Sequence, residues 1–201
     1  MFFIYSKFKG SYWQNYSPNK RLKILQALEK KMAKKLHRPV LPVIVDPQLD
    51  QNCFGLFEVK NNKEHIFINE NLLYVHELRF FALETIIHEG RHAYQYYIIN
   101  KKHISPFNFK AKQWRKNWQG YFTANENKTI YSMQAVERDA QKFTIKMLKS
   151  LAHKYKNEKA FEVTYLTNLR RYEESELNAR KEYGLFYKSK INRKIENKTK
   201  K

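Results

Sequence analysis

The chain has 201 residues, of which 42% are hydrophobic and 15% aromatic, and this is enough apolar material for one packed domain. No run reaches the roughly 18 uninterrupted apolar residues that a membrane span needs, and residues 1–7 lack the pattern of a signal peptide. The single cysteine, Cys53, excludes an internal disulfide framework and a thiolate zinc site. It also fits a reducing compartment, so we expect a cytoplasmic protein.

The chain is strongly basic, with 39 Lys and Arg residues against 19 Asp and Glu residues and a net charge of +20. Such an excess attracts nucleic acid, anionic membranes and acidic proteins without choosing among them. Residues 188–201 hold seven basic residues and one glutamate, which predicts a disordered basic tail after a single domain over residues 1–187. A purely solubilising tail explains this composition at least as well as a contact with nucleic acid.

An N-terminal helix is predicted to begin at Ser17 and Pro18, because serine caps helix N-termini and proline favours the first helical position. Pro39 and Pro42 are expected to end it, since proline cannot continue a helix. Apolar residues recur at helical spacing along this segment, at Leu22, Leu25, Leu28, Met32 and Leu36.

Three short strands are predicted to follow this helix and to form a mostly antiparallel sheet. The first covers Val40–Val45, where β-branched residues predominate. The second and third, Cys53–Lys60 and Glu64–Asn69, are separated by the turn residues Asn61–Lys63, which predicts an antiparallel hairpin. Gly55 is a candidate β-bulge within the second strand.

Helical spacing of apolar residues predicts three long helices in the rest of the chain. They run from a start between Leu72 and Glu77 to about Asn100, from Tyr131 to about Tyr155, and from Lys159 to about Tyr187. Residues 103–128 have weak periodicity, so we expect a long irregular connection or a short helix there, able to wall a cleft.

The first of these helices contains the sequence HEGRH, with His88 and His92 four residues apart and Glu89 beside the first histidine. Four residues are about one helical turn, so both imidazoles can reach one metal ion from the same helix face. This is the HExxH motif of zinc peptidases, in which the carboxylate takes a proton from water. The competing interpretation is a pair of satisfied core or surface histidines.

A catalytic zinc needs three protein ligands and an open fourth position. The metzincin extension is excluded, because Gln95 and Ile98 occupy the places of its glycine and third histidine. The best candidate is Glu137, which lies in the first turns of the next long helix between apolar residues. His103 is the rival third ligand, and an exposed helical glutamate is the alternative explanation of Glu137.

With His88, Glu89, His92 and Glu137, the chain resembles the small gluzincin-type zinc metallopeptidases, and its pattern is similar to uncharacterised metallopeptidases of bacterial mobile elements. The resemblance covers Val40–Tyr155. It implies a zincin-like α+β fold and one Zn²⁺ per chain, with both histidines and the second glutamate as ligands. It also implies that Glu89 is the general base, and that an extended peptide substrate docks along the strand just before the motif helix.

The resemblance leaves two roles open. Larger gluzincins place an acid four residues after the ligand glutamate, but here that place holds Gln141, and the acid is Asp139. Either Asp139 or Glu84, one turn before the first histidine, is a candidate for orienting the imidazoles. Tyr131, near the start of the ligand helix, is a candidate donor to the oxyanion, although many tyrosines in this chain are simply packed.

The sequence therefore predicts a zinc endopeptidase that acts on a peptide or protein substrate and contacts polyanions non-specifically through its basic surface. Two other classes compete with it: a basic nucleic-acid-binding protein with a structural metal, and a zincin-like scaffold that binds partners without catalysis. The scaffold is disfavoured by Glu89, because a structural site has no use for a base beside an open zinc.

Overall fold

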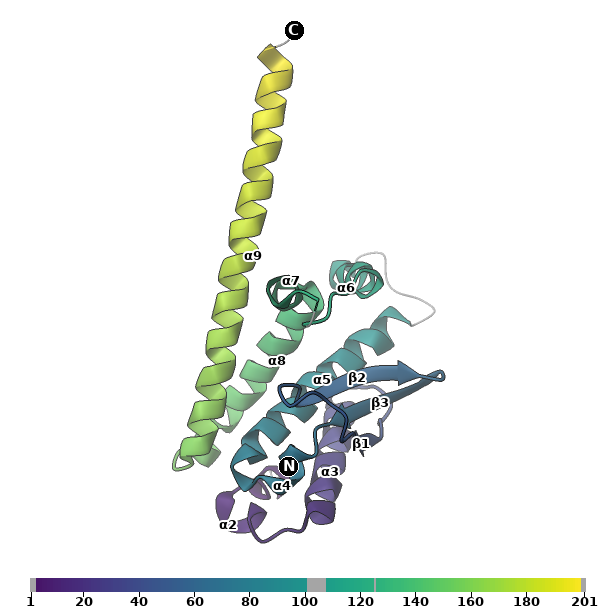
Figure 1. Cartoon of the computed structure of the whole chain (residues 1–201), viewed down its shortest axis with the longest axis vertical. Coiled ribbons are helices and arrows are strands. Elements are labelled where there is room, and N and C mark those ends of the chain that lie inside the picture. The colour runs from purple at the N-terminus through teal and green to yellow at the C-terminus, as the bar shows by residue number, and fades with distance from the viewer. Residues whose placement is uncertain (1–2, 101–107, 125, 200–201) are drawn as a thin grey trace.

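The computed structural model describes residues 3–100, 108–124 and 126–199, with side chains as far as residue 182 except those of residues 3 and 128. Helices predominate, and a small three-stranded mixed sheet lies against them, so the α+β class is confirmed (Figure 1). The elements are α1 (Phe3–Ser6), α2 (Gly10–Trp13), α3 (Pro18–Leu36), β1 (Val43–Val45), β2 (Gly55–Lys60), β3 (Lys63–Ile68), α4 (Asn71–Tyr74), the 3-10 helix η1 (His76–Leu78), α5 (Arg79–Ile99), α6 (Phe109–Gln119), α7 (Lys128–Met133), α8 (Ala135–Leu151), η2 (Ala152–Tyr155) and α9 (Lys159–Thr199).

Helix α3 begins where the sequence predicts it. The Ser17 hydroxyl accepts a hydrogen bond from the Lys20 amide at 3.3 Å, and Pro18 is the first helical residue. Its predicted apolar stripe packs against the core, where Leu25, Leu28 and Met32 are fully buried. This apolar side of α3 faces the core, and α3 packs against α5.

The sheet has the strand order β1-β3-β2. β2 pairs with β3 in the predicted antiparallel hairpin, whose turn residues Asn61 and Asn62 have φ values of 52° and 60°. Both positive angles match a type I′ turn, which fits the twist of a hairpin. β1 pairs with β3 in parallel over three residue pairs, so the sheet is mixed, and its longer ladder of six pairs between β2 and β3 is antiparallel as predicted. The connection between β1 and β2 passes from one edge of the sheet to the other and leaves the central position for β3. This path depends on tertiary packing.

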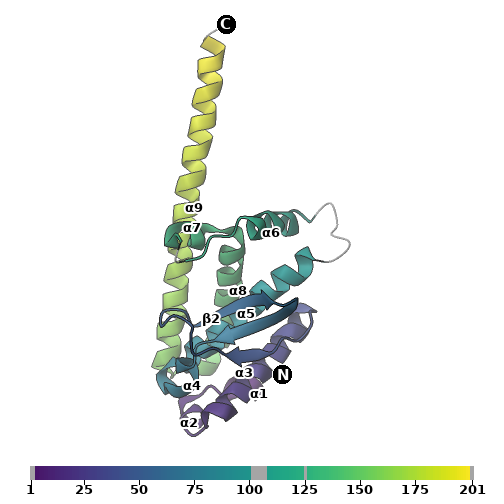
Figure 2. The same ribbon diagram turned by 45° about the vertical axis from the view of Figure 1, so that its right-hand side comes forward.

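The order also corrects the predicted docking strand. β3, the strand just before the motif helix, lies between β1 and β2, so its backbone groups are engaged on both sides. Among the described residues, β2 is instead an open edge beside α5 (Figure 2). An added strand can pair only with such an edge.

Gly55 is not a bulge, because it pairs in regular register with Ile68. Its lack of a side chain serves close packing instead. A Cβ added there would lie 2.4 Å from Cγ2 of Thr85 and 2.9 Å from the backbone oxygen of Phe67. Glycine therefore lets β2 lie directly against α5.

Helix α5 is the central element, in contact with α3, β2, β3, α6, α8 and α9. It begins at Arg79, slightly later than predicted, because the extended backbone of Val75 separates it from α4. Leu83, Ile86 and Ile87 are fully buried in it. The motif histidines are thus carried by the helix that is most enclosed by the fold.

The connection predicted over residues 103–128 contains helix α6, whose first turn is capped by the Asn108 side chain. The rival ligand His103 lies outside the described residues. Tyr131 belongs to the short helix α7 and not to the following long helix. The two helices are separate because Gln134, between them, has a non-helical ψ of 142°.

Helix α9 runs beside α8 and continues past the other elements in both views (Figures 1 and 2). Its backbone is helical to Thr199, beyond the predicted end at about Tyr187. The side chains of residues 183–199 lie outside the described part, so a separate basic tail over residues 188–201 stays a prediction. No helix in the described residues is long and apolar enough to cross a membrane.

Candidate metal centre

The two motif histidines meet Glu137 between α5 and α8. Nε2 of His88 lies 3.1 Å from Nε2 of His92. The two oxygens of the Glu137 carboxylate lie 3.4 Å and 3.3 Å from these nitrogens. In the described residues, this trio forms the group of histidine and acidic side chains that can hold a metal ion. The structure therefore brings together the three ligands that the sequence predicts.

The trio is compact enough to surround a single metal ion. The two imidazole nitrogens are 3.1 Å apart, and each lies near a different oxygen of the Glu137 carboxylate. With one atom taken from each residue, the three candidate ligand atoms lie within 4.8 Å of one another. Two imidazoles and one carboxylate are also the ligand types that zinc accepts in catalytic sites. The residues present can thus hold the metal that the motif implies.

Within the trio, the carboxylate and the imidazoles shift one another's pKa values in the directions that favour their charged forms. Burial works to lower the pKa of His92, but the nearby Glu137 carboxylate outweighs burial and raises that pKa to about 9. Burial works to raise the pKa of Glu137, whereas the His92 and His88 imidazoles hold it well below its usual range. A carboxylate that stays ionised in a buried place is suited to binding a cation.

Glu89 lies at the junction of α5 and the open edge of the sheet. Its Oε2 accepts a hydrogen bond from the backbone N–H of Phe57 in β2 at 2.8 Å. In the described part of the chain, no hydrogen bond to its Oε1 is found. The charge of Glu89 also contributes to the raised pKa of His92, so this carboxylate lies close to the candidate ligands.

Two tyrosines face Glu137 from the segment between α6 and α8. Tyr121 donates its hydroxyl hydrogen to Oε1 of Glu137 at 2.6 Å. Its ring meets that of Tyr131 edge to face at 6.1 Å, and burial followed by the Glu137 charge raises the pKa of both phenols. The sequence points to Tyr131 as a candidate donor but has no signal for Tyr121, which only the fold brings to the centre. Trp118 stacks on Tyr121, and its ring also meets that of His92 edge to face, so this segment borders the centre.

The group that orients an imidazole is Gln95, a residue to which no such role is assigned from the sequence. Its side-chain oxygen lies 2.9 Å from Nδ1 of His92, and its nitrogen donates to Asp139. Asp139 therefore contacts the histidine only through this amide. Gln141 points away, towards Asn168 of α9. The sequence contains a signal for this contact, because Gln95 is a polar residue at helical spacing from His92 on a mostly apolar helix.

The role considered for Glu84 is not supported by a contact. Glu84 is buried one turn before His88, and burial raises the pKa of its carboxyl group. Among the described residues, no hydrogen bond joins the two side chains, and Nδ1 of His88 is buried without a partner. Only one of the two histidines is therefore oriented by a neighbouring side chain.

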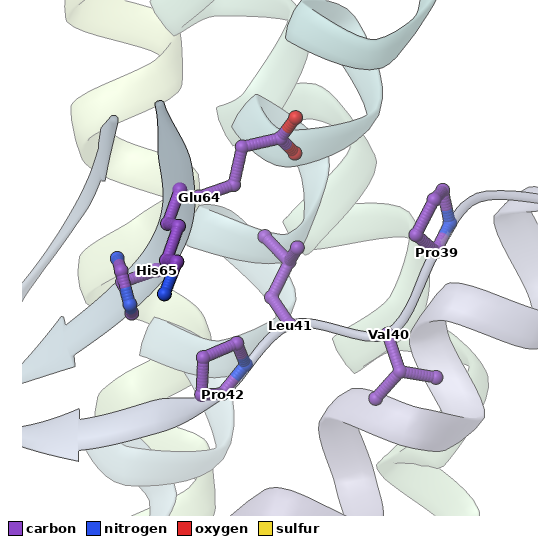
Figure 3. Close-up of a pocket in the computed structure, with 7 residues that line it drawn as sticks. Pro39, Val40, Leu41, Pro42, Glu64 and His65 are labelled. Atoms are coloured by element: carbon purple, nitrogen blue, oxygen red, sulfur yellow. The ribbon is translucent and has the colours of Figure 1, made fainter. Parts of the chain in front are cut away.

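A cavity of about 320 Å³ lies elsewhere, between the segment after α3 and the start of β3 (Figure 3). It is lined by Pro39, Val40, Leu41, Pro42, Lys63, Glu64 and His65. None of the candidate metal ligands lines it, so it has no part in the chemistry of the metal centre.

Comparisons with protein-family models, with curated proteins and with solved structures find no match to this chain.

Proposed function

We propose that this chain is a zinc-dependent peptidase of the gluzincin type. The observation that carries the proposal is the meeting of His88, His92 and Glu137, with the Glu89 carboxylate close to them. Three ligands leave a fourth position open, and a base beside that position is the arrangement that hydrolysis needs.

Each side chain of the centre has a separate task. His88, His92 and Glu137 would hold a zinc ion, which when bound would polarise a carbonyl oxygen and lower the pKa of a water molecule to about 7. Glu89 accepts the proton of the attacking water and delivers it to the leaving amine. The Phe57 N–H holds one oxygen of Glu89, so the other oxygen is the one that carries the proton.

The open edge of β2 is the proposed docking surface for an extended peptide. Phe57 faces Ile66 across the hairpin, and its N–H points away from β3 towards Glu89. Gly55 and Val59, two residues away on either side, have the same orientation in an antiparallel ladder. A peptide that pairs with this edge therefore passes beside the proposed base.

Tyr131 is proposed to donate a hydrogen bond to the oxyanion of the transition state. It lies beside Glu137, and burial followed by the charge of this carboxylate raises its pKa, so its hydroxyl keeps the proton at neutral pH. Tyr121 is already bonded to Glu137 and is assigned to holding that ligand. Accordingly, Tyr131→Phe should lower kcat while zinc stays bound, whereas Tyr121→Phe should weaken zinc binding.

The decisive test is Glu89→Gln, assayed on a broad peptide library with added zinc and a chelator control. The amide preserves the side-chain shape but cannot accept the proton of water, so cleavage should be lost while zinc content and fold are preserved. Neighbouring residues cannot replace the base, because Gly90 has no side chain and the Arg91 guanidinium can only donate hydrogen bonds. Cleavage by Glu89→Gln at the wild-type rate would contradict the mechanism, and no cleavage by the wild type would favour the non-catalytic scaffold.

A further inference from the structure

Gln95 is fully buried on α5, one turn after His92. Its Oε1 lies 2.9 Å from Nδ1 of His92. Its Nε2 donates to the backbone oxygen of Val136 at 2.9 Å and to Oδ2 of Asp139 at 3.0 Å. This one amide therefore contacts a candidate metal ligand on α5 and, on α8, Val136 and Asp139, which lie one residue before and two residues after Glu137.

These contacts decide which way round the Gln95 amide lies. A backbone oxygen and a carboxylate only accept hydrogen bonds, so the amide nitrogen must face them and Oε1 must face His92. Because Oε1 can only accept, Nδ1 of His92 must carry a proton. In the neutral ring, Nε2 then keeps its lone pair, and this nitrogen lies 3.3 Å from Glu137 and 3.1 Å from His88.

The same contacts join the two helices that carry the ligands. Nε of Arg91 donates to Oδ2 of Asp139 at 2.7 Å, and Arg91 lies one turn before Gln95 on α5. Two successive turns of α5 are therefore attached to the first turns of α8. Glu137 lies between the attached residues Val136 and Asp139, so these bonds hold the part of α8 that carries its carboxylate.

We propose that Gln95 is a positioning residue of the metal centre. It selects the tautomer of His92 in which Nε2 is free to bind metal. Together with Asp139, it also holds α8 at the separation that brings Glu137 to both histidines. The inference rests on the zinc binding of the proposed function but not on peptidase activity. Partners of metal ligands typically change metal affinity by about 10- to 100-fold.

The test measures the zinc affinity of the full chain by competition with a chromogenic chelator. Gln95→Met removes the hydrogen bonds and keeps the side-chain length, so zinc affinity should fall by about 10- to 100-fold. Gln141→Met is the matched control, because the Gln141 amide also joins two helices, through Asn168 at 2.6 Å, away from the metal centre. This control should leave zinc affinity unchanged.

A second pair of variants keeps the test valid if Gln95→Met fails to fold. Gln95→Glu keeps an acceptor for His92 but places a carboxylate against Asp139, so zinc affinity should fall. Adding Asp139→Asn supplies a donor for the new carboxylate and should recover part of the loss. In ¹H–¹⁵N NMR spectra of zinc-loaded protein, the Nδ1–H of His92 should exchange more slowly with water in the wild type than in Gln95→Met, because only the wild type offers this proton an amide acceptor.

The outcomes separate this inference from the proposed function. Wild-type zinc affinity in Gln95→Met, or no recovery in the double variant, would overturn the role of Gln95 and leave the peptidase proposal intact. Zinc binding without cleavage by the wild type would overturn the peptidase and leave the role of Gln95 standing. Absence of zinc binding by the wild type would overturn both.

Discussion

Glu137 joins the two halves of the candidate metal centre. Its carboxylate contacts both imidazoles of α5 and accepts the hydroxyl hydrogen of Tyr121. A buried carboxylate of this kind is costly unless cations or donors surround it. The arrangement explains why a glutamate early in α8, which local sequence alone cannot distinguish from a surface residue, is buried here.

Glu137→Ala should remove stoichiometric zinc, because two imidazoles alone leave the metal with too few protein ligands. Metal analysis of the purified protein after dialysis measures the effect. His103→Ala is the comparison, since His103 is the rival ligand. Full zinc in Glu137→Ala combined with loss in His103→Ala would show that the third ligand has been assigned to the wrong residue.

At the scale of elements, the centre depends on how closely its neighbours approach α5. β2 reaches the helix because Gly55 has no side chain, and this contact brings the Phe57 N–H to Glu89. On the α3 side, Arg38 donates to the backbone oxygen of Gly90 at 3.1 Å and forms a buried ion pair with Glu29. A Cβ on Gly90 would lie 3.0 Å from that guanidinium, so the glycine of the motif makes room for it.

Gly55→Ala should destabilise the fold by about 1–3 kcal/mol, because the new methyl group meets Thr85 and the backbone of β3. Urea unfolding measures the change in the free energy of unfolding. Gly120→Ala is the matched control, since a Cβ there meets nothing within 4 Å. Adding Thr85→Ser removes one of the clashing atoms and should restore part of the loss. Equal stability of Gly55→Ala and Gly120→Ala would refute the close-packing argument.

At the scale of the whole molecule, the charge is unevenly placed. The outer face of α3 carries exposed lysines at Lys20, Lys23, Lys30, Lys34 and Lys35. Glu29, the one acid of this helix, is turned inwards and paired with Arg38. The face is therefore uniformly basic, and it suits the phosphate backbone of nucleic acid, which carries closely spaced negative charges.

Changing Lys23, Lys30 and Lys34 together to glutamate should weaken DNA binding. The plot of the logarithm of the DNA-binding constant against the logarithm of the salt concentration should also become less steep, by about 3 in its slope. The control makes the same net charge change on α8, at the exposed residues Lys142, Lys146 and Lys149. Equal weakening by both sets would mean that net charge, and not the α3 face, causes the binding.

Deleting residues 188–201 should also weaken binding to DNA, because this segment holds seven basic residues. The zinc content should stay unchanged, since no described ligand of the candidate centre lies in the segment. Fluorescence anisotropy with labelled DNA and metal analysis of the same sample measure the two effects. Loss of zinc on truncation would show that the segment belongs to the fold.

The sequence by itself determined the features that depend on neighbours along the chain. The cap of α3, the Asn61–Asn62 turn and the placing of two histidines on one helix face all follow from spacing over a few residues. Glu137 could also be identified, because a motif with two ligands requires a third and the next strong helix offers a glutamate.

Only the tertiary structure decided the features that depend on distant parts of the chain. The central place of β3, the close packing of Gly55 and the contact of Tyr121 with Glu137 join segments that have no local signature for one another. The same holds for Gln95, whose polarity was visible in the sequence but whose partners on α8 were not. The physical reason is that buried polar groups must be satisfied by whatever the packing brings to them, and the packing is a property of the whole chain.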